Sequence, residues 1–448
     1  MIRRNALKMG LQSLAAFLPL RAARGASAAA AGMLDVRDFG ARGDDRADDS
    51  PAIARALDAA RKVGEYGEGA RGSIVFFPPG IYRVSRPLDC TAGQFNLLGC
   101  GPAQSVLRGA TRGDGDCVID FTAAGFSSAR GLLIDVVTDG RGNPAARAST
   151  VGVLIARGAG GASATAVNLA DLMVRLKSDP GANGRNGTVA LYNFGGEEAN
   201  YHNVYLRGDC AVVVTSENAR ASGGYGLSSP YRPLLQGSAS MSALSVTGLS
   251  SLIGIAGPAL RLYGGAAMQV DAFLGSHAAS PPGGEFPGVA AYPFAIHGRG
   301  MWTDFRHTGS MEGFEGLLHL DGAQMYGARL YSYMGRSTAV PAIRLSGASS
   351  LYGCDLDVTA NAAARGVVSY LVDDDGRAPA KQVQGCHIRL RGQRLRLRAP
   401  GSVIAGNVIQ SEEPLAATRA KLTAPGSLAG NLITAIDGVE ANGVALGG

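Results

Sequence analysis

DVRDFGARGDDRADDSPAIARALDAA (residues 35–60) and GSIVFFPPGIYRVS (residues 72–85) are the two stretches that decide the fold. The first joins an acidic loop to a segment with apolar residues at helical spacing: Ile53, Ala56, Leu57 and Ala60. We expect Ser50 to cap this helix and Pro51 to occupy its first turn, where an N–H group is not needed. The second stretch is rich in β-branched and aromatic residues, which indicates a strand interrupted by Pro78-Pro79-Gly80.

Together these residues resemble the N-terminal signature of the pectate-lyase superfamily. The resemblance implies an all-β fold, a single-stranded right-handed parallel β-helix (solenoid) with an N-terminal capping helix. Such a helix would cover backbone edges and core that the first coil otherwise exposes. The acidic run, Asp44, Asp45, Asp48 and Asp49, suits the N-terminus of that helix. A calcium site is the alternative reading of the same run.

Residues 1–32 have the pattern of an export signal. Arg3-Arg4 and Leu7-Lys8 resemble a twin-arginine motif, and Ala26-Ser27-Ala28 suits a cleavage site. An ordinary export signal containing two arginines is the alternative. The apolar run is too short to span a membrane. We therefore expect a periplasmic or secreted protein with no membrane span.

The charge balance argues against nucleic acid as a partner. The segment before residue 33 holds five of the 42 basic residues and no acidic one, which leaves 37 basic and 36 acidic residues. A nearly neutral chain lacks the basic surface that nucleic-acid binding needs. We expect a polysaccharide partner, and the oligomeric state stays open.

Residues 33–448 are expected to form one β-helix domain, with 33–90 as capping segment and first coil. A short repeat supports this view: YGARL (326–330), YGCDL (352–356), QGCHI (384–388), AGNVI (405–409) and AGNLI (429–433). The glycines at 327, 353, 385, 406 and 430 are separated by 21 to 32 residues, a spacing that suits one coil of three short strands.

Stacked coils would align equivalent residues in columns along the axis. We expect one outward column of Arg329, Asp355 and His387, and a second of Tyr331, Asp357 and Arg389. These columns are either part of a site or a solvated charge ladder. Cys354 would lie over Cys386. Of the six cysteines we expect mostly buried thiols, with Cys90 and Cys100 as the best candidates for a disulfide.

No motif in the chain names a reaction, because the catalytic boxes of polygalacturonases and of pectate lyases are both missing. The richest polar cluster is the segment 302–319, which we expect to line a surface groove. The predicted catalytic residues are Asp304, Arg306, His307, Glu312 and Arg329. The predicted substrate-binding residues are Glu198, His202, Trp302, Glu315 and Asp355. We expect no metal ligands and no cofactor, with Ca²⁺ as a possibility.

The cluster suits lyase or epimerase chemistry on a uronic-acid polysaccharide. That chemistry needs a cation to neutralise the sugar carboxylate, here Arg306 or Arg329, and a base, here His307. A glycoside hydrolase would instead use two carboxylates, Asp304 and Glu312. A non-catalytic carbohydrate-binding protein of the cell envelope is the third possibility, since fold alone does not fix function.

Overall fold

The computed structural model describes residues 32–63, 73–109, 117–136, 151–158, 164–176, 188–215, 244–255, 257–265, 268–276, 294–302, 305–313, 316–334, 343–360, 369–374, 381–392, 395–398, 402–411, 432–434, 439–441 and 444–446. The predicted export signal therefore lies outside the described residues, apart from Gly32. Within this part of the chain, α3 (Ser50–Val63) is the one helix, and strands form nearly everything else.

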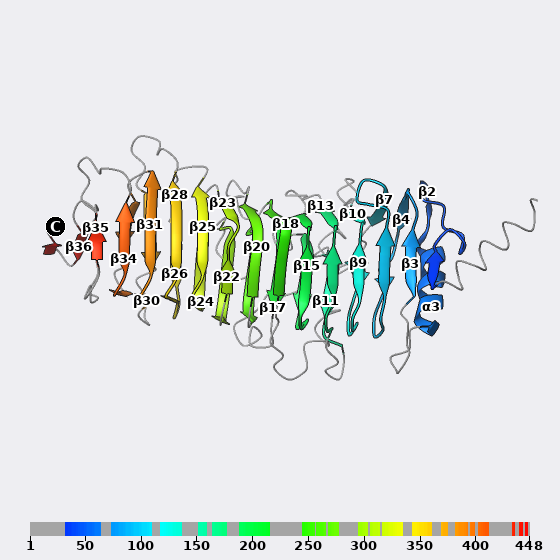
Figure 1. The fold of residues 1–448 in the computed structure, drawn as a ribbon, viewed down its shortest axis with the longest axis horizontal. Coiled ribbons are helices and arrows are strands. Elements are labelled where there is room, and N and C mark those ends of the chain that lie inside the picture. The colour runs from blue at the N-terminus through cyan, green and yellow to red at the C-terminus, as the bar shows by residue number, and fades with distance from the viewer. Residues whose placement is uncertain are drawn as a thin grey trace, which may run out of the picture.

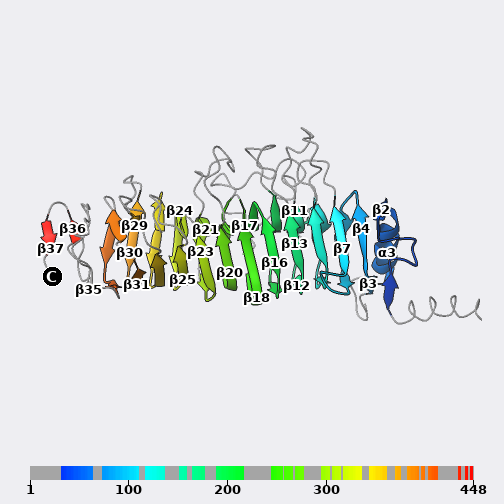
Figure 2. The ribbon, with the colours of Figure 1, turned by 90° about the horizontal axis from the view of Figure 1, so that it is seen from above.

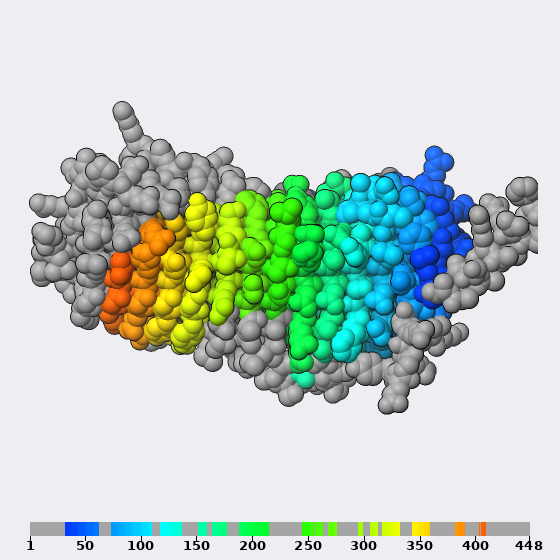
Figure 3. Space-filling model, viewed as in Figure 1, coloured from blue at the N-terminus to red at the C-terminus, as the bar shows by residue number. Residues whose placement is uncertain are grey.

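Two long parallel sheets wind around one axis, which makes the molecule an elongated parallel β-helix (Figures 1, 2 and 3). Sheet A has 21 strands and sheet B has 14. Strands pair with their equivalents one coil away, as in the series β7–β10–β13–β16. The fold class predicted from the sequence is confirmed.

Sheet A consists of β1 (Met33–Asp35), β2 (Asp44–Asp48), β3 (Ile74–Phe77), β4 (Gly80–Val84), β6 (Asn96–Gly99), β7 (Ser105–Gly109), β9 (Ser128–Arg130), β10 (Leu133–Val136), β12 (Asn168–Ala170), β13 (Met173–Leu176), β15 (Ala199–His202), β16 (Tyr205–Gly208), β18 (Leu244–Gly254), β20 (Met268–Ser276), β22 (Phe305–His307), β23 (Ser310–Gly313), β25 (Arg329–Met334), β28 (Asp355–Ala360), β31 (His387–Gly392), β34 (Val408–Ser411) and β35 (Leu432–Thr434).

Sheet B consists of β5 (Leu88–Asp89), β8 (Cys117–Asp120), β11 (Val151–Ala156), β14 (Val189–Phe194), β17 (Cys210–Thr215), β19 (Leu260–Gly265), β21 (Ile296–Trp302), β24 (Leu318–Tyr326), β26 (Ile343–Ser346), β27 (Ser350–Tyr352), β29 (Ser369–Asp374), β30 (Lys381–Gln384), β32 (Leu395–Arg398) and β33 (Ser402–Ala405). A separate antiparallel pair, β36 (Val439–Ala441) and β37 (Val444–Leu446), lies at the C-terminal end (Figure 2).

The glycine repeat marks a tight turn that leads from a strand of sheet B into a strand of sheet A. Gly327, Gly353, Gly385 and Gly406 have φ between 59° and 64°, a conformation that glycine adopts without steric cost. The residue after the glycine points inward, so Cys354 and Cys386 are 1% exposed and stack on adjacent coils, as predicted. Gly430 lies outside the described residues.

Helix α3 covers the N-terminal end of the β-helix (Figure 1). Its apolar face is buried as predicted, with Ile53, Ala56, Leu57 and Ala60 at most 2% exposed. The predicted capping role of Ser50 is wrong, because the Asp49 carbonyl accepts the first helical bond from Ile53 N at 2.9 Å. The Ser50 hydroxyl instead accepts from Ser85 N at 2.8 Å and donates to Asp48 at 2.7 Å, which fastens the helix to the end of β4.

Protein groups bond each carboxylate of the acidic run. Asp44 accepts from the backbone N–H groups of Ala47 and Arg46, which lower the pKa of its carboxyl. Asp49 accepts from Arg42 N at 2.7 Å and Gly43 N at 3.1 Å. Asp45 pairs with Arg108. Helix and loop structure thus accounts for the run, and the calcium alternative stays a hypothesis.

The cysteines are free thiols, and five of the six are buried. The exception is Cys100, which is exposed and does not pair with Cys90. Burial raises the pKa of the Cys90 thiol well above its usual range. The suggested Cys90–Cys100 disulfide is therefore wrong for this structure, whereas the expectation of mostly buried thiols is confirmed.

Candidate functional site

Sheet B places four ionisable side chains on consecutive coils of its outer face. The register pairs Arg261 with His297, His297 with His319, and His319 with Arg344. Strand neighbours such as Leu260 belong to the hydrophobic core. Because side chains alternate along a strand, these four point away from the core. We call Arg261, His297, His319 and Arg344 the imidazole column.

The imidazole column is buried although it lies on the outer face. Arg261, His297 and His319 are 3%, 1% and 5% exposed, and Arg344 is half-buried. Taking cations and imidazoles out of water is costly, so such groups are rarely retained as packing material. Buried titratable groups gathered on one surface are typical of functional sites.

The two histidines of the column are in direct contact. The ring centroids of His297 and His319 are 4.8 Å apart at an interplanar angle of 68°, and the Phe294 ring lies 5.2 Å from that of His319. His319 Nε2 lies 2.7 Å from Ser346 Oγ, a hydrogen bond whose direction depends on the imidazole tautomer. Phe294 and Ser346 therefore fix the orientation of the His319 ring.

A half-buried polar edge adjoins His319. Asp321, Arg344 and Ser346 are all partly accessible. Gly347 follows Ser346 with φ 59°, and a Cβ there would lie 2.9 Å from Gly322 N and 3.2 Å from Asp321 Oδ1. Glycine is thus required at 347, and its small size lets the Asp321 carboxylate approach the end of β26. The arrangement offers an imidazole, a carboxylate, a guanidinium and a hydroxyl at one edge.

The same outward position of sheet B is apolar on the preceding coils. Leu154 pairs with Tyr192, Tyr192 with Val213, and Val213 with Arg261. The first three belong to a separate apolar cluster with Cys117, Val151, Ala156, Val189, Phe194 and Cys210. Burial raises the pKa of the Cys210 thiol to about 12, and the positive charge of Arg261 opposes part of that rise. The imidazole column begins where this cluster ends.

The two columns predicted beside the glycine repeat form on sheet A. Arg329, Asp355 and His387 occupy adjacent coils, and His387 Nδ1 lies 3.5 Å from Asp355 Oδ1. Tyr331, Asp357 and Arg389 form the second column. The structure thus brings Arg329 and Asp355 together as predicted. Their catalytic and binding roles stay predictions.

Arg306 and His202 lie on sheet A and Glu198 in the turn before β15, but Arg306 does not meet the other two. Arg306 is exposed on β22 and pairs with Gln269. His202 is exposed on β15, where Nδ1 lies 3.0 Å from Thr247 Oγ1, and Glu198 is exposed in the turn before β15 with φ 54°. Strands β18 and β20 separate β15 from β22, which corresponds to ~14 Å along the axis at ~4.8 Å per coil.

The predicted place of His307 in a surface groove is wrong. Its side chain is 0% exposed and points into the core, where Nε2 lies 3.1 Å from the Ala272 carbonyl oxygen. Burial lowers the pKa of this imidazole to about 4. The alternation of β22 explains the error, because an outward Arg306 requires an inward His307.

The segment 302–319 does not line one groove, which corrects a second prediction. Trp302 ends β21 of sheet B, Glu312 lies in β23 of sheet A, and His319 returns to sheet B in β24. One coil crosses several faces within this length, so the polar residues are divided among them. The side chains of Trp302 and Glu312 lie outside the described residues, as do Asp304 and Glu315 entirely.

Sequence reasoning missed the imidazole column. The available signal was a histidine at the same place in two consecutive strands, Ile296-His297-Gly298 and Leu318-His319-Leu320. In the ranges that the structure describes, no group of three or more His, Cys, Asp or Glu residues is arranged to hold a metal ion. In the same ranges no helix is long and apolar enough to cross a bilayer.

Comparison with known proteins found one family model and several similar structures. Residues 33–223 match the family described as rhamnogalacturonase A/epimerase, pectate lyase-like. The solved A-module of mannuronan C-5 epimerase AlgE6 from Azotobacter vinelandii is 17% identical, with 89% of this chain and 99% of that chain covered and a TM-score of 0.36. An α-1,3-glucanase catalytic unit from Streptomyces thermodiastaticus is 16% identical, with 91% and 70% covered and a TM-score of 0.45.

Curated relatives match over a short part of the chain. Alginate lyase 7 of Azotobacter vinelandii is 36% identical over 80 residues, 16% of this chain and 8% of the relative. Mannuronan C5-epimerase AlgE3 of the same organism is 38% identical over 84 residues, 17% of this chain and 4% of the relative. A probable glucan endo-1,3-β-glucosidase of Arthroderma benhamiae is 33% identical over 88 residues, 19% and 10%. The chain thus spans a tenth or less of these relatives.

The fold is a parallel β-helix, and its N-terminal part matches the pectate lyase-like family model. The matched residues, 33–223, include α3 and the first coils. The imidazole column begins at Arg261, beyond the end of the match. Its chemistry therefore has to be argued from its own geometry.

Proposed function

We propose that the protein is a polysaccharide-modifying enzyme acting outside the cytoplasm, and that it is a lyase or epimerase of a uronic-acid polymer. The observation that carries this proposal is the imidazole column, in which two contacting histidines lie between two arginines on one outer face. The relatives named as an alginate lyase and a mannuronan C5-epimerase support the same class of reaction.

The chemistry needs a base and a cation close together. Abstraction of the proton next to a sugar carboxylate places negative charge on that carboxylate, and a guanidinium stabilises the charge. Arg344 is partly accessible and adjacent to His319, so it is the proposed carboxylate partner. His319 is the proposed base, with its ring held by Ser346 and Phe294. Return of the proton to the other face gives an epimer, whereas loss of the glycosidic oxygen gives a lyase product.

Purified mature protein incubated with a panel of polyuronates tests the proposal. A lyase generates unsaturated uronates, which absorb in the ultraviolet, and an epimerase incorporates solvent deuterium at the epimerised carbon. His319→Ala should reduce turnover about 100-fold or more, since a positioned base contributes that much. Arg344→Gln should also lower turnover. Full activity in both variants would contradict the assignment to sheet B.

Two variants on sheet A serve as the matched comparison. Arg329→Gln and His202→Ala remove residues that the sequence predicts for catalysis and substrate binding, on a different face of the molecule. Under the sheet B assignment they should retain most of the turnover. If they abolish turnover while the sheet B variants do not, the site predicted from the sequence is the correct one.

Glycoside hydrolysis is the second candidate. Asp321 is a half-buried carboxylate on the same strand as His319, and a relative named as a glucan endo-1,3-β-glucosidase belongs to that class. A hydrolase needs two carboxylates, of which Asp321 would be one. Reducing ends that form without unsaturated product, and that Asp321→Asn abolishes, would favour hydrolysis. Binding of the polymer without any turnover would favour a carbohydrate-binding protein.

A further inference from the structure

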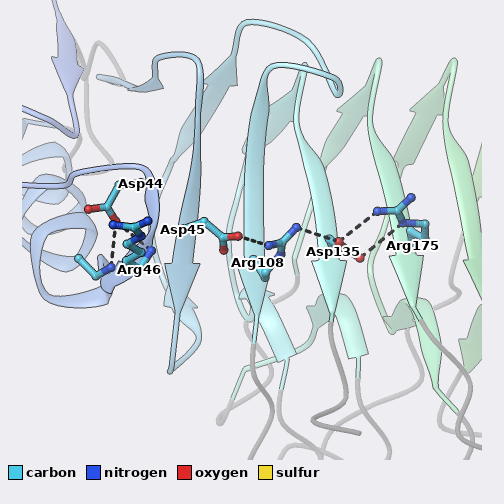
Figure 4. A network of polar contacts seen from close by, with 7 residues as sticks. Asp44, Asp45, Arg46, Arg108, Asp135 and Arg175 are labelled. Atoms are coloured by element: carbon cyan, nitrogen blue, oxygen red, sulfur yellow. Dashed lines mark hydrogen bonds and ion pairs between the residues drawn. The ribbon is translucent and has the colours of Figure 1, made fainter.

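A second charged surface lies on sheet A, away from the imidazole column. The register stacks Arg83 on Arg108, Arg108 on Asp135, Asp135 on Arg175, and Arg175 on Arg207. We call these five residues the arginine column. They occupy outward positions on β4, β7, β10, β13 and β16, which stack on successive coils. Figure 4 shows the central part of the series.

Asp135 organises the middle of the arginine column. Its carboxylate is 4% exposed and lies between two guanidinium groups, 3.7 Å from Arg108 NH2 and 3.1 Å from Arg175 NH2. Arg175 Nε is a further 3.4 Å contact with the other carboxylate oxygen. Asp45 pairs with Arg108 from the opposite side (Figure 4). These ion pairs hold the guanidinium groups of Arg108 and Arg175 in place.

The column carries more positive charge than its own Asp135 and the neighbouring Asp45 neutralise. Arg83 and Arg207 are exposed and have no carboxylate partner among the described residues, and each lies beside another arginine of the column. Like charges on directly adjacent strands destabilise a sheet. An anion bound between Arg175 and Arg207 would relieve that repulsion, and Arg175 is 46% exposed and therefore accessible to it.

Apolar surface runs beside the charged surface. Met173 and Tyr205 are half-buried, pair with each other on adjacent coils, and lie two residues before Arg175 and Arg207 on the same strands. An aromatic ring next to a guanidinium suits a sugar ring that bears an anionic group. A compact inorganic anion would not use the tyrosine.

We propose that the arginine column, with Tyr205, is a docking surface for an anionic polysaccharide, separate from the site of reaction. A polymer with an acidic group on each sugar can contact several coils at once, because the column runs along the axis. The imidazole column lies on the other sheet and begins on the coil after β17. The docking surface therefore holds the polymer and raises its local concentration without taking part in the reaction.

The double variant Arg175→Gln/Arg207→Gln tests the docking surface. Arg207 is an exposed outward group, and Asp135 keeps its contact with Arg108 when Arg175 is replaced, so the fold should persist, which thermal unfolding verifies. Binding to polygalacturonate, measured by affinity electrophoresis and calorimetry at several salt concentrations, should weaken roughly tenfold, with a shallower salt dependence. The matched control is Arg42→Gln/Arg86→Gln, which removes two exposed arginines outside the column and should stay within about twofold of wild type.

Any of four results would overturn the proposal. The first is equal weakening in both double variants, which would indicate a diffuse charge effect. The second is a neutral glucan that binds wild type as tightly as polygalacturonate does. The third is polyphosphate binding as tightly as the polyuronate. The fourth is unchanged binding after Tyr205→Ala. In either case a sugar ring would play no part. His319→Ala should bind the polymer normally, so a failed reaction proposal and a failed docking proposal give different results.

Discussion

One outward position of sheet B is apolar in one part of the molecule and ionisable in the next. Leu154, Tyr192 and Val213 occupy it on three coils, and Arg261 and His297 occupy it on the two that follow. The strands are parallel, and the register at this position is continuous, on both sides of the change. The difference teaches that the repeat fixes where a side chain points, whereas the individual residue decides whether the position packs or reacts.

Val213→Asp, which puts a charge into the apolar part of this position, is the variant with the largest expected effect on stability. Val213 is 0% exposed within an apolar cluster, so a carboxylate there loses water without gaining partners. We expect the free energy of unfolding to fall by roughly 3 kcal/mol or more. Chemical denaturation measures this value, and Leu249→Asp is the control because Leu249 is 94% exposed and its loss should change stability by about 0.5 kcal/mol at most. Equal stability of the two variants would mean that the apolar coils tolerate charge as the imidazole column does.

His307 is a second kind of buried histidine. Its side chain lies in the core, whereas His297 and His319 lie on the outer face of sheet B. The pKa of His307 is about 4 in the folded protein against 6.5 in the unfolded chain. Between these values the unfolded state binds more protons, so the free energy of unfolding falls as the pH drops from 6.5 towards 4. The loss approaches about 3 kcal/mol at the acid end and is absent above pH 6.5.

Urea denaturation between pH 4 and pH 7 checks this expectation. His307→Gln should lack that part of the pH dependence, since glutamine does not titrate. His202→Gln is the matched control, because it makes the same substitution at an exposed histidine of sheet A. Identical profiles for wild type and His307→Gln would show that His307 is not protonated on unfolding.

A smaller effect is expected at the turn that sets the repeat. Gly353 has φ 59° with no atom within 4 Å of an added Cβ, so Gly353→Ala tests backbone strain without crowding. We expect a loss of about 1–2 kcal/mol, measured as a lower unfolding midpoint. Gly353→Asn should lose less, because Asn203 and Asp171 already adopt this conformation with φ 51° and 49°. Two equally destabilised variants would contradict the strain argument.

The residues beside the glycine repeat were predictable because glycine fixes their register. Each glycine begins the same turn, so Arg329, Asp355 and His387 could be aligned by counting from it. The capping helix was predictable for a similar reason, since its apolar spacing is local. The first hydrogen bond of the helix was not predictable. The Ser50 hydroxyl bonds to Ser85, which is distant in the sequence, and the Asp49 carbonyl accepts the first helical N–H.

The imidazole column was not predictable, because no fixed turn residue precedes the strands of sheet B. Segments of different length separate β19, β21 and β24, so the alignment of His297 with His319 appears only when the coils are stacked. Asp135 was missed for the same reason, since its partner Arg175 is forty residues away in the chain. His307 was misplaced because the cluster was judged by composition, and composition does not give the phase of a strand.

Helix α3 gives the protein a direction of assembly. It closes one end of the β-helix and is fastened there through Ser50, Asp48 and Ser85. Each later coil needs only the coil before it as a template, so ordered structure can extend from the N-terminal end while the rest of the chain is still being synthesised. Twin-arginine export, which the sequence predicts for this chain, carries proteins that are already folded. A solenoid closed first at its N-terminus would be ready for such a route soon after its last coil leaves the ribosome.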